Sequence, residues 1–317
     1  MGKRRCFCLS ATAAVLLTAC SASDLPTAVS DLGRAVTVDA VFANAHLPGP
    51  MEFQKVTAAR WSVPLSGLLN LEHPRAQAAG LVDRDEPISI YTYVLKHPVH
   101  GTFLVDAGVS ESFRSADNQD VSWIVNKAMN FQALAVKTSN RELLEMLDGE
   151  PLAGVFLSHI HLDHIMGFDD LPADTLVYLG PGDIGQRAIE HFATRGTTDR
   201  LLANVQGLAE WNFDDSRTLD VFGDGSLFAL HAPGHTAGLT VYLARTTQGT
   251  QLMIGDLTHT RWGWENGVEP GSYSSDIPAS AGSLAWIKAL VEQYDPGGNI
   301  ITVHPGHQSL DEAEPGR

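Results

Sequence analysis

A cluster of metal-ligating residue types constrains this chain more than any other feature. The sequence HIHLDH at 159–164 places three histidines and one aspartate within six residues. An apolar stretch at 154–158 comes directly before it and predicts a buried strand that runs into a turn. A polar loop with hydrogen-bonded histidines is the alternative interpretation. So dense a cluster favours a metal site, because neutral imidazoles and carboxylates are good ligands for zinc and similar ions.

The spacing within this cluster predicts how its side chains divide. In a turn that follows a strand, alternate residues such as His159 and His161 can face one metal ion. Asp163 and His164 can then face a second ion. The sequence therefore predicts a pair of neighbouring metal sites rather than one.

The rest of the chain alternates between strand-like and helix-like segments, which predicts a layered α/β sandwich. Segment 60–87 contains several Pro and Gly residues and fits no regular element, so we expect a loop over the site there. Strands are expected at 36–41, 52–58, 88–96, 102–106, 154–158, 175–179, 226–231, 239–244, 251–254 and 299–303, and helices at 140–147, 182–192 and 279–294.

The N-terminus is typical of an export signal. Three basic residues at 3–5 precede an apolar stretch at 9–19 that is too short to span a bilayer as a permanent helix. It ends in LTAC at 17–20, which resembles the lipobox of bacterial lipoproteins, whose cysteine is acylated and becomes the first mature residue. An ordinary cleaved signal is the alternative. We expect a signal peptide at 1–19, a tether at 20–35 that starts with acylated Cys20, and one folded domain at 36–317, held on the periplasmic face of a bacterial membrane.

Charge and cysteine content narrow the partners and the metal ligands. The chain has a net charge of −16, and removing residues 1–19 takes away three basic residues and no acids, which leaves −19. Such a surface disfavours nucleic acid, whose binding needs a basic footprint, and also disfavours electrostatic docking to anionic lipid. Membrane attachment should then come from the lipid alone. The only cysteines are at 6, 8 and 20, so metal ligands in the domain must be His, Asp or Glu.

The HIHLDH cluster resembles the HxHxDH signature of the metallo-β-lactamase superfamily, and the family's other motifs follow in order. The resemblance covers roughly residues 36–310 and implies a four-layer αββα sandwich with the metals at one edge between the sheets. In the family an early aspartate supports the site, and later residues bind metal. The matching positions are Asp106 in LVDAG, His235 in PGHT, Asp256 in GD and His307 in PGH.

This resemblance assigns seven ligands to two divalent ions, which we expect to be zinc because imidazoles dominate. The first ion takes three histidines, the second takes one aspartate and two histidines, and another aspartate bridges both: His159, His161 and His235; Asp163, His164 and His307; and Asp256. His304 could replace His307, but His307 follows Pro-Gly at a strand end as the family motif does. His231 is expected to pack in the core or to support a ligand.

The overall pattern is most similar to that of quorum-quenching lactonases and their organophosphate-hydrolase relatives. Well-known acyl-homoserine lactonases have a tyrosine three residues after the bridging aspartate, where this chain has His259. An Asp-x-x-His arrangement looks more like the organophosphate-hydrolase branch. True metallo-β-lactamases usually have Cys or Ser at the position of Asp256, which argues against a β-lactam substrate.

We therefore expect a hydrolase that uses a metal-bridging hydroxide on lactones or carboxylic esters. Phosphoester or organophosphate hydrolysis from the same site is the alternative, and a non-catalytic metal-binding envelope lipoprotein is a third hypothesis. Asp163 is expected to act as a ligand that can also shuttle a proton, and His259 to hydrogen-bond the substrate or leaving group, or else to form the pocket wall. Trp262 and Trp264, with segment 60–87, are candidates for the apolar wall, with simple packing as the alternative for the tryptophans.

Overall fold

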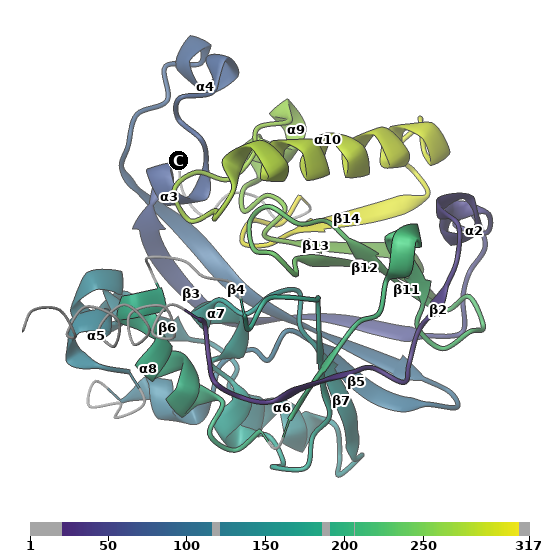
Figure 1. The fold of residues 1–317 in the computed structure, drawn as a ribbon, viewed down its shortest axis with the longest axis horizontal. Helices are drawn as coiled ribbons and strands as arrows, with labels where there is room; N and C mark the ends of the chain where they lie inside the picture. The colour runs from purple at the N-terminus through teal and green to yellow at the C-terminus, as the bar shows by residue number, and fades with distance from the viewer. Residues whose placement is uncertain (1–20, 116–120, 186–190, 206, 311–317) are drawn as a thin grey trace, which may run out of the picture.

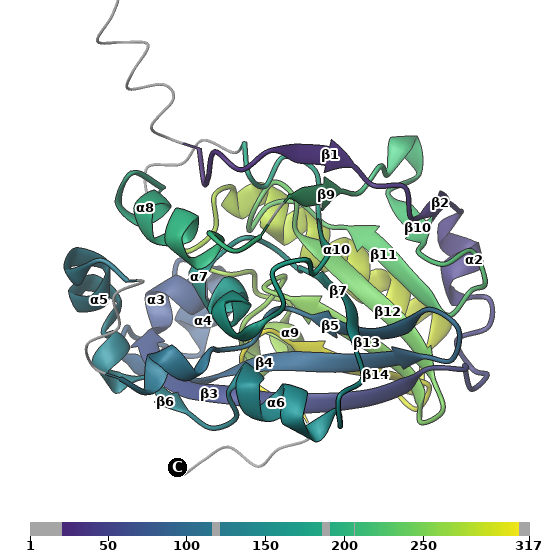
Figure 2. The same ribbon diagram turned by 90° about the horizontal axis from the view of Figure 1, so that it is seen from below.

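Two β-sheets form the centre of the protein (Figures 1 and 2). The computed structural model describes residues 21–115, 121–185, 191–205 and 207–310. The eight-stranded sheet has the order β1 (Thr27–Val29), β9 (Leu208–Glu210), β8 (Val177–Leu179), β7 (Leu152–Phe156), β5 (Gly101–Val105), β4 (Asp85–His97), β3 (Glu52–Pro64) and β6 (Ala135–Val136). The six-stranded sheet has the order β14 (Ile301–Pro305), β13 (Gly249–Gly255), β12 (Thr240–Thr246), β11 (Leu227–His231), β10 (Thr218–Asp220) and β2 (Arg34–Ala35).

Helices cover the outer faces of the two sheets. The long helix α10 lies over the six-stranded sheet, and α5 to α8 lie beside the eight-stranded sheet (Figure 1). The bounds of the α-helices are α2 (Val38–Phe42), α3 (Leu65–Leu68), α4 (Pro74–Ala78), α5 (Trp123–Met129), α6 (Asn140–Met146), α7 (Leu162–Ile165), α8 (His191–Leu201), α9 (Arg261–Asn266) and α10 (Ile277–Tyr294).

Three buried hydrophobic clusters of the described residues fill the spaces between these layers. Successive residues of a strand face opposite sides of a sheet, and β7 shows this clearly. Phe156 packs between the two sheets together with Tyr242 of the other sheet, whereas Val155 faces the helices. A further cluster joins the six-stranded sheet to α10 through residues such as Ile287. The layers are therefore helix, sheet, sheet and helix, which confirms the predicted αββα sandwich.

One predicted element is wrong, and another is wrong at its N-terminal end. Residues 36–41 were expected to be a strand because they are rich in valine, but α2 occupies 38–42. The Thr37 side chain accepts a hydrogen bond from the backbone N of Ala40 at 3.3 Å and caps the helix. Residues 182–192 were expected to be a helix, but 182–185 form turns and the helix α8 begins at His191; residues 186–190 lie outside the described part of the chain.

The expected loop at 60–87 is also partly wrong, because β3 continues to Pro64 and β4 begins at Asp85. The prolines misled the prediction. Pro64 is the last residue of its strand, and at Pro87 only β3 pairs with β4, since β5 pairs with Tyr93–His97. A proline is tolerated where no ladder hydrogen bond is required of it. Between these strands lie the short helices α3 and α4.

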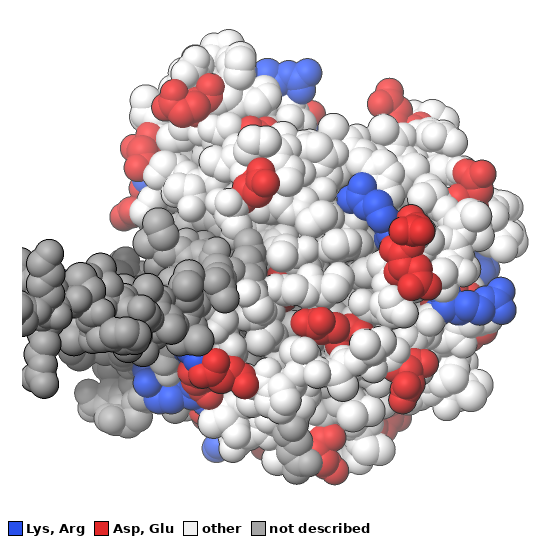
Figure 3. Space-filling model, in the orientation of Figure 1, with Lys and Arg blue, Asp and Glu red and all other residues white. Residues whose placement is uncertain are grey.

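The N-terminal segment has structure where a tether was expected. Residues 1–20, which include the expected signal peptide and Cys20, lie outside the described residues. In the stretch from 21 to 35, β1 pairs with β9 and β2 pairs with β10. Within the described residues, no helix is long and apolar enough to cross a membrane. On the face shown in Figure 3, acidic side chains are spread over the surface with basic ones scattered among them.

The topology brings the predicted motifs to one edge. β5 and β7 are parallel neighbours, as are β13 and β14, so their carboxyl ends lie together in pairs. Asp106 follows β5 and His159 follows β7, while Asp256 follows β13 and His307 follows β14. Because side chains at the carboxyl ends of neighbouring parallel strands converge, this edge is where a site is expected.

Candidate metal centre

Seven side chains form two groups that share one aspartate. Within each group, one potential ligand atom from every residue lies within 4.8 Å of the others. The groups are His159, His161, His235 and Asp256, and Asp163, His164, Asp256 and His307. The structure thus brings together all seven residues that the sequence analysis proposed as ligands and divides them in the same way. Their role as ligands stays a prediction.

The first group is built from three loops. His159 and His161 come from the turn between β7 and α7, His235 comes from the turn between β11 and β12, and Asp256 comes from the loop after β13. Nε2 of His235 lies 2.9 Å from Nδ1 of His161. Oδ2 of Asp256 lies 3.5 Å from Nε2 of His159 and 3.4 Å from Nε2 of His235. These atoms converge on one point, as ligands of a single ion do.

The second group contacts both oxygens of Asp256. Nε2 of His164 is 3.4 Å from Oδ2 of Asp256, and Nε2 of His307 is 3.4 Å from its Oδ1. Oδ2 of Asp163 is 3.1 Å from Nε2 of His307 and 3.7 Å from Nε2 of His164. Each oxygen of Asp256 therefore faces histidines, and the carboxylate can join two ions.

Asp106 and Ser158 support this centre through hydrogen bonds. Asp106 is buried, and its Oδ1 accepts a hydrogen bond from the backbone N of Ser158 at 2.7 Å. Its Oδ2 accepts one from Ser158 Oγ at 2.9 Å and lies 2.8 Å from Nδ1 of His164. A carboxylate accepts only, so Nδ1 of His164 carries the proton and leaves Nε2 for a metal. The predicted supporting role of Asp106 thus has a concrete form. The residue has a φ of 60°, a strained value that Asp tolerates better than most side chains.

Other ligand candidates are oriented in the same manner. Nδ1 of His307 donates to the backbone oxygen of Ser89 at 2.9 Å, which leaves Nε2 directed at the two carboxylates. Nδ1 of His235 lies 3.2 Å from Ser274 Oγ. A partner on one ring nitrogen fixes both the orientation and the tautomer of an imidazole that binds metal through the other.

The donor set fits divalent cations. Several buried polar atoms have no hydrogen-bond partner among the described residues, and three of them belong to ligand candidates: Nε2 of His159, Nε2 of His164 and Oδ1 of Asp256. Buried polar atoms without partners are costly unless something else satisfies them. Burial opposes charge on His307, but the carboxylates of Asp256 and Asp163 outweigh it and raise its pKa to about 10. The carboxylates thus attract positive charge, and His and Asp donors suit zinc.

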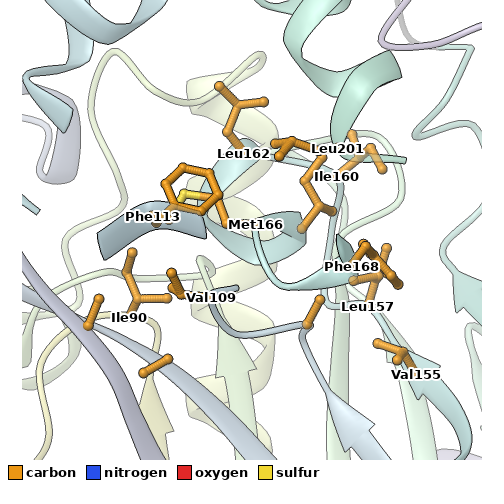
Figure 4. Close-up of a cluster of buried hydrophobic side chains, with 14 of the residues drawn as sticks. Ile90, Val109, Phe113, Val155, Leu157, Ile160, Leu162, Met166, Phe168 and Leu201 are labelled. Atoms are coloured by element: carbon orange, nitrogen blue, oxygen red, sulfur yellow. The ribbon is translucent and has the colours of Figure 1, made fainter. Parts of the chain in front are cut away.

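The apolar residues within the motif anchor the turn in the hydrophobic core. Ile160 and Leu162 alternate with the histidines and are buried in the cluster that also contains Met166 and Leu201 (Figure 4). While Ile160 and Leu162 pack in this cluster, the side chains of His161 and Asp163 belong to the two ligand groups. The HIHLDH sequence therefore serves the core and the site with alternate residues.

A cavity of about 270 Å³ lies beside the metal centre. Asp163, Asp256, His161, His259 and His307 give it a polar end, and its other walls are mostly apolar. The apolar lining includes Trp61, Val63, Leu68, Ile88, Ile160 and Leu162. This is the arrangement of a small-molecule site, with few polar groups at the reacting end and apolar surface around the remainder of the ligand.

His259 and Tyr273 are polar side chains of this cavity that fall outside both ligand groups. Nδ1 of His259 donates to the backbone oxygen of Leu68 at 2.8 Å, and its Nε2 lies 3.1 Å from Oδ2 of Asp256. The ring of Tyr273 lies edge-on to His259, with centroids 6.3 Å apart. Burial raises the pKa of Tyr273 to about 12, so its hydroxyl remains a hydrogen-bond donor at neutral pH.

Sequence reasoning had no signal for Tyr273 or for Asp183, because their contacts join segments far apart in the chain. A side chain at Gly67 would come within 2.3 Å of the Tyr273 ring, so this glycine lets the ring lie against α3. Oδ1 of Asp183 accepts a hydrogen bond from the backbone N of Gly238 at 2.6 Å, just beyond the His235 turn. Burial raises the pKa of Asp183 to about 7.

Several weighed residues lie outside the centre. His304 is buried elsewhere, with Nε2 2.8 Å from Oε1 of Gln251, so the geometry favours His307 over it. Nε2 of His231 donates to the backbone oxygen of Ala237 at 2.9 Å, a supporting role for the next turn. Trp262 and Trp264 pack against hydrophobic clusters and are absent from the cavity lining, whereas segment 60–87 does line it through residues such as Trp61 and Leu68.

A third group of potential ligands, made of His97, His100 and Asp224, lies away from this centre. Nδ1 of His97 accepts hydrogen bonds from the backbone N of Val99 and of His100, both at 3.1 Å. Its proton is therefore on Nε2, which donates to Oδ2 of Asp224 at 2.9 Å. With both nitrogens occupied, His97 closes the β4–β5 turn and offers no lone pair to a metal.

Comparisons with known proteins point to one superfamily. A model of the metallo-beta-lactamase superfamily matches residues 85–261, more than half of the chain. The metallo-hydrolase mfmC of Annulohypoxylon moriforme is 26% identical over 213 residues, which cover 61% of this chain and 50% of that protein. The N-acyl homoserine lactonase AttM of Rhizobium johnstonii is 30% identical over 162 residues, which cover 47% of this chain and 57% of that protein.

The fold is also similar to that of solved structures. A mutant of AiiA from B. thuringiensis, with N-decanoyl-L-homoserine bound at its active site, matches with a TM-score of 0.58 and 18% identity. The match covers 81% of this chain and 92% of that one. The chain spans about half the length of the two curated relatives above. From its sequence motifs, its sandwich and the matching family model, this chain belongs to the metallo-β-lactamase superfamily.

Proposed function

We propose that this protein is a metal-dependent hydrolase of small lactones or carboxylic esters. One observation carries the proposal: two groups of potential metal ligands share Asp256 at the polar end of a mostly apolar cavity. The names of the relatives support it, since AttM is called an N-acyl homoserine lactonase and mfmC a metallo-hydrolase. Two divalent ions, with zinc as the expected metal, would be held by the seven side chains described above.

The chain's own residues would bind, orient and protonate the substrate. When bound, two such ions supply hydroxide at neutral pH and Lewis-acid stabilisation of developing negative charge. The apolar walls hold the substrate and exclude water. Tyr273, which stays protonated, can donate a hydrogen bond to a substrate oxygen. Asp163, which lines the cavity, can carry a proton to the departing oxygen.

His259 is placed to hydrogen-bond the substrate without holding a metal. Nδ1 of its ring is held by the backbone oxygen of Leu68, and the residue lines the cavity. We expect His259→Ala to keep both metals but to lower kcat by roughly 10–100-fold, the lower range for a hydrogen-bond donor or general acid. Steady-state kinetics and elemental analysis measure the two effects, with the exposed His46→Ala as control. If kcat and KM of His259→Ala were unchanged, His259 would be only a residue of the cavity wall.

A substrate panel tests the proposed function. The purified, metal-loaded chain is assayed with an acyl lactone, an aryl ester and a phosphotriester. Turnover of the lactone or ester that is lost on chelation and restored by metal is the expected result. Preference for the phosphotriester would move the assignment to organophosphate hydrolysis. Metal binding without turnover of any member would favour a non-catalytic binding protein.

We also propose that the mature protein begins at acylated Cys20 and is held on the periplasmic face of a membrane, on the strength of the basic, apolar and LTAC segments at the N-terminus. Intact-mass analysis of membrane-extracted protein tests this. A mature chain that starts elsewhere and carries no added lipid mass would contradict it.

A further inference from the structure

The segment just before β1 forms part of the cavity wall. Ala22 lines the cavity and is only 2% exposed. Thr194 and Thr198 of α8 line the same cavity. Residues 21–25, here called the N-terminal strap, thus lie against α8 at the substrate site, although more than a hundred residues separate the strap from the HIHLDH motif.

Several contacts hold the strap in place. The backbone N of Ala22 donates to the backbone oxygen of Ile184 at 3.0 Å. Ser23 Oγ donates to Oδ1 of Asp199 at 2.6 Å, and Nη1 of Arg195 donates to Ser21 Oγ at 2.9 Å. Arg195 also forms an ion pair with Asp24. Hydrogen bonds and an ion pair thus hold the strap against α8 and against Ile184, so the strap is an ordered part of the cavity wall.

The pairing of β1 fixes the strap from its other end. β1 adds to the eight-stranded sheet beside β9, and the backbone N of Leu208 donates to the oxygen of Pro26 at 3.3 Å. The backbone of the strap is therefore hydrogen-bonded both at Ala22 and where it joins the sheet. A larger side chain at Ala22 must extend into the cavity or detach the strap from α8.

We propose that Ala22 is a specificity-determining residue that limits the length or bulk of the apolar group on the substrate. The inference rests on the proposed lactone or ester hydrolysis and deepens it. Its basis is the cavity's chemistry, because the metal end holds the polar groups and the remaining lining is mostly apolar. The reacting carbonyl belongs at the metal end, so an acyl chain must lie along the apolar walls, which Ala22 helps to form.

The test compares short and long acyl chains on variants of the full chain. For Ala22→Phe, we expect kcat/KM for a decanoyl lactone to fall by about tenfold or more while that for a butanoyl lactone changes by less than about twofold. Ala22→Val should show the same selectivity to a smaller degree, and serves if the larger side chain prevents folding. The matched control is Ala28→Phe in β1, which lies in the same N-terminal segment and is exposed.

Two failures are distinguishable. If the natural chain hydrolyses both lactones and the Ala22 variants keep its chain-length preference, the strap does not contact the substrate and this inference is wrong. If the natural chain hydrolyses neither lactone nor ester, the proposed function fails and the inference fails with it. A displaced strap would lower both activities together and reduce the melting temperature, which also contradicts a role in selectivity.

Discussion

Replacing Asp256 with alanine is expected to abolish the dinuclear site and nearly all hydrolysis. Asp256 belongs to both ligand groups, and its two oxygens lie 3.4–3.5 Å from nitrogens of ligand histidines in both groups. Without it, buried imidazoles face one another with a single remaining carboxylate, Asp163. We expect retained metal to fall to about one ion per chain or fewer and kcat/KM to fall roughly 10³-fold or more.

Elemental analysis and kinetics on the same preparation measure these effects. The exposed Asp215→Ala removes an aspartate away from the centre and should change neither. If Asp256→Ala retained two ions at full occupancy, the bridging role would be wrong, whatever the activity.

Asp163→Asn should weaken the second metal site and leave the first one intact. The substitution keeps the size of the side chain but removes the negative charge that lies 3.1 Å from Nε2 of His307. Burial opposes ionisation of Asp163, but His164 and His307 outweigh it and lower the carboxyl pKa, so the natural residue is an anion at neutral pH. We expect the second ion to bind weakly, the first to remain, and turnover to fall by about 10²-fold or more.

The measurement is metal content during dialysis at graded free zinc, followed by kinetics on each sample. Asp169→Asn is the matched control, because it makes the same chemical change at an exposed site shortly after the motif. A variant with two tightly bound ions and natural turnover would show that Asp163 is neither a ligand nor a proton carrier.

The site was more predictable from the sequence than the elements around it. The ligand candidates sit directly after strands, and the carboxyl ends of parallel strands meet at one edge, so motifs such as HIHLDH and PGH converge wherever the sheet forms. The supporting role of Asp106 was implied by the resemblance of LVDAG to the family's early motif. Its bonds to Ser158 and His164 then give that role a geometry.

What the sequence could not supply depends on long-range packing. Valines at 36–41 favour a strand by propensity, but the Thr37 cap and burial of Val41 and Phe42 stabilise a short helix. The prolines of 60–87 concealed two long strands. Ala22 and Tyr273 reach the cavity only through contacts with distant segments, and no local pattern marks such residues.

Metal stoichiometry of the full chain tests the central claim most directly. The chain is stripped with chelator, reloaded with zinc, freed of unbound metal and analysed for metal and protein in the same sample. The seven-residue centre predicts close to two ions per chain, and the same value for His100→Gln, because both ring nitrogens of His97 in that third group are already hydrogen-bonded. One ion or none in the natural chain would contradict a shared dinuclear site, and so would a second ion that disappears in His100→Gln.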